Sequence, residues 1–178
     1  MRMSEVVGRL AADGNVGTAW SCEHRDPVPL SPDALSALRM PDGSPLIDEL
    51  ATWLAYDASW LPLLDETRSR FATRPLKAIF AEWAGAMMEG QKRPRGGRGP
   101  RSAMDLVRIW IDFLPSAALR DVPALLLPQS GSQAHVLMFE PGRSELRVLG
   151  SQQRFELWWK YQRFSDYAAH YFGFINPR

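Results

Sequence analysis

The sequence contains a single cysteine, Cys22, and no long apolar segment. One cysteine cannot form an internal disulfide, so nothing in the chain calls for an oxidising compartment. The first residues do not lead into a signal-peptide-like apolar stretch, and apolar runs such as 124–127 and 136–139 are far too short to cross a bilayer. These absences predict a cytoplasmic protein that has no membrane partner.

An excess of charge of one sign is also missing. Lysine and arginine number 21 against 20 aspartates and glutamates, which gives a formal net charge of +1. Dedicated nucleic-acid binders are usually strongly basic, because neutralised phosphates supply most of their affinity. The charge balance therefore argues against nucleic acid as the main partner.

Residue clusters typical of metal and catalytic sites are scarce. Zinc sites need about four ligands, but Cys22 and His24 have no second pair nearby, and His135 and His170 are isolated in the sequence. The chain lacks a Gly-x-Ser-x-Gly elbow, a phosphate-binding glycine loop and a dinucleotide fingerprint. We therefore expect no metal, no cofactor and no enzymatic activity. A small hydrolase or transferase that uses Cys22 or His135 remains the enzymatic alternative.

The composition is that of a globular protein. Of 178 residues, 46% are hydrophobic and 23% are charged, so the chain can bury a core without disulfides or metals. The length favours a single domain over residues 1–178, with residues 1–30 as an N-terminal extension and residues 91–101 as a flexible basic loop.

Helical signals dominate the first half of the chain. Residues 4–12 carry apolar side chains at helical spacing, and Ser31-Pro32 and Ser44-Pro45 each place a capping hydroxyl before a proline. A long helix is expected to begin after Pro75 and to end at Gly90, because its apolar residues recur at steps of three and four.

The second half shows alternation typical of strands. A half-buried strand is predicted over 107–113, with a helix as the alternative, because Val107, Ile109, Ile111 and Phe113 alternate with Arg108, Trp110 and Asp112. Further strands are expected over 134–140, 146–149 and 155–161, followed by a helix over 165–172 capped by Ser165. The order predicts an α+β fold, with an antiparallel sheet in the C-terminal half and helices packed on one face.

Two tryptophans are candidates for contact with a partner. Trp110 and Trp158 fall on the polar phase of their expected strands, and exposed tryptophans are enriched at binding hot spots. Together with neighbouring basic side chains they predict a partner-binding face made of Trp110, Trp158, Arg108, Lys160 and Arg154. The alternative is that a loop or a second copy of the chain covers this face, which would make a homodimer.

Residues 92–101 form the one strongly biased segment, rich in arginine, glycine and proline. We interpret it as a solvated loop. The alternative is a weak nucleic-acid or regulatory binder that works through this loop, although the segment lacks the interleaved aromatic residues that stack on bases.

Segments at both ends of the expected fold resemble the SUKH superfamily. They are the helical stretch 45–57, the strand segments 127–128, 135–139, 147–149 and 155–161, and the terminal stretch 164–169. The resemblance implies a SUKH-like α+β fold and a bacterial immunity protein, which binds and neutralises a cognate protein toxin in the cytoplasm. It implies no cofactor and no catalytic residue.

Overall fold

The computed structural model describes residues 1–12, 26–61, 63, 70–90, 102–127, 134–151 and 157–175. Cys22, Arg154 and the basic segment 92–101 lie outside these ranges. Among the helices inside them, none has the length and apolar character needed to cross a membrane.

Helices lead the chain and strands follow, as expected for an α+β fold. The helices are α1 (Met3–Ala12), α2 (Pro32–Ala37), α3 (Asp48–Leu54), α4 (Leu76–Gly90), α5 (Ala103–Phe113) and α6 (Phe164–Tyr171), with a 3₁₀ turn, η1, at Ala117–Asp121. The strands are β1 (Arg74–Pro75), β2 (Pro123–Leu126), β3 (Ala134–Met138), β4 (Val148–Ser151) and β5 (Leu157–Tyr161). The predicted α+β class and the last three predicted strands are confirmed.

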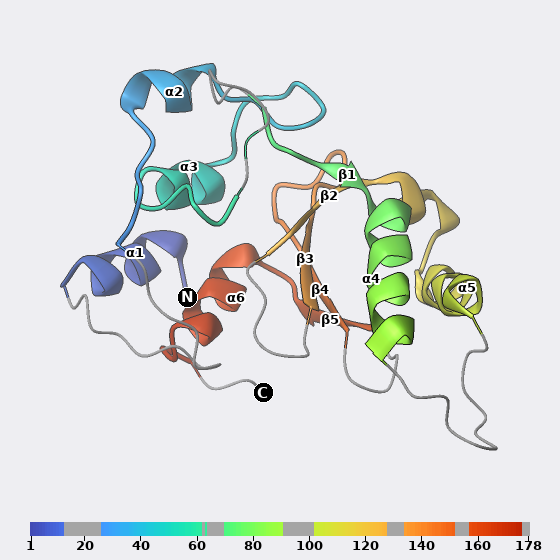
Figure 1. Ribbon diagram of the computed structural model, residues 1–178. Coiled ribbons are helices and arrows are strands. Elements are labelled where there is room, and N and C mark those ends of the chain that lie inside the picture. Colours follow the sequence, from blue (N-terminus) through green and yellow to red (C-terminus); the bar gives the residue numbers. More distant parts are fainter. Residues whose placement is uncertain are drawn as a thin grey trace.

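The five strands form one antiparallel sheet in the order β1-β2-β3-β4-β5. Each strand pairs with the strand that follows it in the chain, so the sheet is a simple meander. In Figure 1 the sheet stands in the middle of the molecule, with α4 and α5 on one side and α1, α3 and α6 on the other.

Both faces of the sheet are apolar. In β3, Leu137 belongs to one buried cluster, whereas its neighbours Val136 and Met138 belong to another. Successive side chains of a strand point to opposite faces, so consecutive apolar residues require a cover on each side. The prediction that helices pack on one face only is therefore wrong: helices cover both.

The first core joins the sheet to α1, α3 and α6. Its centre is aromatic: Trp53 of α3 lies with its ring centroid 4.7 Å from that of Trp60 and 5.9 Å from that of Phe164 of α6. Met3, Val6 and Leu10 of α1 are buried in the same cluster. The helix predicted over 4–12 is thus confirmed as part of this core.

The second core joins the sheet to α4 and α5. Leu106, Val107 and Trp110 of α5 are buried against α4, at the spacing of one helical face. The Ser102 hydroxyl caps α5 by accepting the amide of Asp105 at 3.1 Å. The strand predicted over 107–113 is therefore wrong, and the helix that was the alternative is correct, because the cap and the packing on α4 outweigh the local alternation of β-branched residues.

Of the three serines predicted to cap helices, one does so and two do not. The Ser31 hydroxyl accepts the amide of Ala34 at 3.2 Å and caps α2 as expected. Ser44 caps no helix, since α3 begins later, at Asp48. Ser165 lies inside α6, and its amide donates to a side chain of α3 instead.

Candidate functional site

Trp110 is not a surface residue. It is 0% exposed and packs in the second core, with its ring centroid 5.4 Å from that of Phe80 and 6.2 Å from that of Trp83. The prediction that it contacts a partner is wrong, because residue 110 belongs to a helix and points toward α4 and not outward from a strand.

Arg108, two positions earlier on α5, is exposed. The same helix also exposes Met104 (73%), Ile109 (49%) and Phe113 (46%), together with the acids Asp105 and Asp112. Among the residues whose exposure the structure describes, four large hydrophobic residues are exposed: these three of α5 and Val28. We call Met104, Arg108, Ile109 and Phe113 the α5 face.

The other predicted contact residues lie elsewhere. Trp158 and Lys160 belong to β5, where Trp158 is paired with Gly150 of β4. Arg154 falls outside the described residues. The expected set thus does not form a single sheet face, because Arg108 and Trp110 sit on a helix of the second layer and Trp158 and Lys160 sit on a strand.

The sequence contains a signal for the α5 face that the alternating pattern obscured. Ser102 precedes a stretch in which Leu106 and Trp110 are four residues apart, and Ile109 and Phe113 are also four apart. On a helix, these two pairs occupy different faces, one buried and one exposed. The strand interpretation instead assigned Ile109 and Phe113 to the buried side.

Of the reactive groups proposed for an enzyme, His135 lies in the interior. It is 0% exposed, and its Nδ1 lies 3.5 Å from the hydroxyl of Tyr167 in α6. Nearby, the hydroxyl of Tyr161 shares a hydrogen bond with Nδ1 of His170. His135 is therefore not open to solvent, while Cys22 is outside the described residues.

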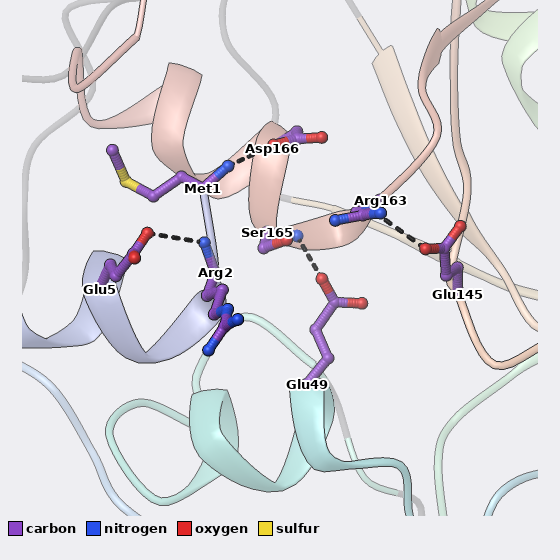
Figure 2. A network of polar contacts seen from close by, with 8 residues as sticks. All are labelled: Met1, Arg2, Glu5, Glu49, Glu145, Arg163, Ser165 and Asp166. Atoms are coloured by element: carbon purple, nitrogen blue, oxygen red, sulfur yellow. Dashed lines mark hydrogen bonds and ion pairs between the residues drawn. The ribbon is translucent and has the colours of Figure 1, made fainter.

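A polar network joins the starts of three helices (Figure 2). Its contacts are the Met1 amino group to Asp166 Oδ1 at 3.0 Å, the Arg2 amide to Glu5 Oε2 at 2.9 Å, the Ser165 amide to Glu49 Oε1 at 2.7 Å, and Arg163 Nε to Glu145 Oε1 at 2.9 Å. Glu49 rises from α3 and points at the first turn of α6. The network borders a cavity of about 600 Å³.

Glu49 belongs to this network and has a shifted pKa. Burial raises the pKa of its carboxyl above the usual 4.5, the nearby Asp166 adds to this, and the hydrogen bond from Ser165 acts in the opposite direction. Each acid of the network is already engaged within the chain. The arrangement therefore holds α1, α3 and α6 together and explains the polar residues at this junction without a ligand.

No group of three His, Cys, Asp or Glu side chains within the described ranges is placed to hold a metal ion. The comparisons with known proteins add no relative: no family model, no curated protein and no solved structure matches the chain. The α5 face is thus the surface feature that most needs a functional explanation.

Proposed function

We propose that this chain is an immunity-type protein, which binds a bacterial protein toxin through the α5 face and neutralises it. The observation that carries the proposal is the exposure of Met104, Ile109 and Phe113 on the helix that also exposes Arg108. Large apolar side chains exposed to water are costly to hydrate, and several of them on one element favour a protein-protein contact.

The chemistry of the α5 face suits a protein partner. Binding energy at interfaces concentrates in a few large apolar and arginine side chains near the centre of the contact. Arg108 can pair with a partner carboxylate in a bidentate manner while the apolar side chains on either side exclude water. The face is presented by a helix that is packed on α4 and capped at Ser102, so little ordering entropy is lost on binding.

The remaining features support this function and the cytoplasm as its location. The resemblance of the helical stretch 45–57, the strand segments and the terminal stretch 164–169 to the SUKH superfamily points to immunity proteins, which act on toxins inside the producing cell. The single cysteine and the near-neutral charge agree with a cytoplasmic protein whose partner is another protein.

The test is a binding titration with the toxin encoded by the adjacent gene. The double variant Ile109→Ser/Phe113→Ser should weaken the complex about tenfold or more, because two apolar anchors are lost. Val28→Ser is the matched control, since Val28 is 47% exposed and lies far from α5 in the chain. The affinity of Val28→Ser for the toxin should stay within about twofold of that of the wild type.

Both variants should keep the circular dichroism and urea midpoint of the wild type, because the substituted side chains are solvent-exposed. A folded double variant that binds the toxin as tightly as the wild type would rule out the α5 face.

A further inference from the structure

A groove lies beside the turn at residues 39–44, where it meets two other segments of the chain. It consists of two adjoining hollows of about 740 and 340 Å³. The hollows share Met40, Pro41, Asp42 and Pro123, so they form one continuous depression. Segment 70–73 borders the larger hollow, and segment 139–144 borders the smaller one. Both volumes fall within the range of ligand-binding pockets, about 300–1,000 Å³.

The central wall of the groove is a tight, hydrogen-bonded turn. The Met40 amide donates to the Ser44 carbonyl at 2.9 Å, and the Gly43 amide donates to the Met40 carbonyl at 2.8 Å. Gly43 takes a φ of +84°, which favours glycine, and Arg39 and Pro45 are bridged as antiparallel partners. The groove is therefore preformed, and a ligand would not need to order this wall.

The side chains that line the groove give it a positive balance. Three arginines face two acids: Arg39, Arg70 and Arg143 against Asp42 and Glu140. Glu140 is already neutralised, because Arg147 donates to both of its carboxylate oxygens and Arg143 Nε also lies 3.4 Å from Oε2. Within the described ranges no carboxylate forms an ion pair with Arg39 or Arg70. The groove thus has an electrostatic preference for an anionic ligand.

The floor of the groove is apolar and carries no exposed aromatic face. Phe71 and Phe139 are buried and pack on each other, with ring centroids 5.2 Å apart, and Met40 is also buried. Single-stranded nucleic acids need aromatic faces on which bases can stack. Carboxylates along an extended polypeptide, by contrast, match arginines spaced along a groove in the planar, bidentate manner that arginine favours.

We propose that this groove binds an extended acidic segment of a partner polypeptide, with its carboxylates on Arg39, Arg70 and Arg143. This surface is separate from the α5 face, and the proposal goes beyond the immunity function, since it needs no particular toxin. Arg70 is the residue that best reports on it. Arg39, by contrast, also stabilises its own turn by donating through one guanidinium nitrogen to the carbonyls of Ser36 and Leu38.

The test uses a fluorescein-labelled ten-residue peptide of alternating glutamate and alanine, titrated with the full chain and followed by anisotropy. Arg70→Glu should weaken binding about tenfold or more, and a glutamine-alanine peptide should bind about tenfold more weakly than the acidic one. Raising the salt concentration should also weaken binding, because exposed charge pairs are screened. Amide chemical shifts should move in residues 40–44, 70–73 and 139–144.

Arg120→Glu is the matched control, because Arg120 is an exposed arginine of η1 outside the groove. Its affinity for the peptide should stay within about twofold of the wild type. No binding of the acidic peptide at millimolar concentration, or equal binding by Arg70→Glu, would overturn the proposal. Tighter, Arg70-dependent binding of a twenty-nucleotide oligothymidylate would overturn it in favour of nucleic acid. The toxin takes no part in this assay, so its outcome is independent of the α5 face.

Discussion

Glu49 of α3 accepts the backbone amide of Ser165, 116 positions later in the chain, at 2.7 Å, and so caps the first turn of α6. The first-turn amides of a helix have no partner within the helix and favour a negative group. Here the group comes from another helix, so one side chain both satisfies α6 and ties it to α3 (Figure 2).

This contact predicts opposite results for two substitutions at position 49. Glu49→Ala removes the acceptor and should lower the free energy of unfolding by about 1–2 kcal/mol. Glu49→Gln keeps an oxygen that can accept the Ser165 amide and avoids burying a charge. It should therefore be at least as stable as the wild type at pH 7, as measured by urea unfolding.

The pH dependence follows from the direction of the pKa shift. The pKa of Glu49 is raised in the folded state above its usual 4.5, so the folded state binds the proton more tightly than the unfolded chain. The wild type should therefore lose stability relative to Glu49→Gln as pH rises from 4.5 through the folded pKa. If the two proteins differ by a constant amount from pH 4 to pH 7, Glu49 does not titrate as its burial implies.

A second prediction concerns two serines with similar sequence contexts. Ser31→Ala removes the hydroxyl that accepts the Ala34 amide, and hydrogen exchange at Ala34 should become about fivefold faster, which corresponds to about 1 kcal/mol for a lost cap. Ser44→Ala should leave the amides of α3 unchanged, because that helix begins at Asp48. Faster exchange in α3 for Ser44→Ala would show that Ser44 does act as a cap.

The sequence predicted an element correctly where its local apolar pattern matches the side chains that are buried in the folded protein. Pro75 and Gly90 bracket α4, and the predicted strands at 134–140 and 146–149 overlap β3 and β4, because their apolar runs are the buried parts of the sheet. The expectation of helices on one face came instead from the order of the elements, with helices before strands. Val148 and Leu149 are adjacent apolar residues that belong to different cores. Such neighbours indicate that both faces of the sheet are covered.

The candidate site was harder to predict, because it depends on the identity of a single element. At residues 107–113 the β-branched residues favour a strand, while Ser102 and the spacing of Leu106 and Trp110 favour a helix. Choosing the strand exchanged the inside and the outside of the segment: Trp110 was assigned to the surface, and Ile109 and Phe113 to the core. The Glu49–Ser165 contact could not be predicted at all, since nothing local links residues so far apart.

The third prediction tests whether Trp110 is buried and Ile109 is exposed. Trp110 fills the second core between Phe80 and Trp83, so Trp110→Ala should lower the free energy of unfolding by about 3–5 kcal/mol. Ile109→Ala, at the neighbouring position, removes an exposed side chain and should change the free energy of unfolding by no more than about 0.5 kcal/mol. Urea unfolding at neutral pH measures both. A mild effect of Trp110→Ala would mean that residue 110 does face solvent.

The fourth prediction concerns the buried pair of Tyr161 and His170. Burial raises the pKa of the Tyr161 hydroxyl well above its usual value of 10, so the phenol stays neutral in the folded state. The unfolded chain can ionise this group above about pH 10, so the fold loses stability as pH rises beyond that point. Tyr161→Phe removes both the titration and the hydrogen bond to His170, and should cost about 1–3 kcal/mol at pH 7.

The difference in stability between the wild type and Tyr161→Phe should therefore shrink between pH 9 and pH 11, as only the wild type has this phenol to ionise. Tyr56, whose pKa burial also raises, is present in both proteins and cancels in the comparison. Urea midpoints at half-unit steps of pH give the measurement. A difference that stays constant over this interval would mean that the Tyr161 hydroxyl ionises in the folded state as readily as in the unfolded chain, and that water reaches the layer between β5 and α6.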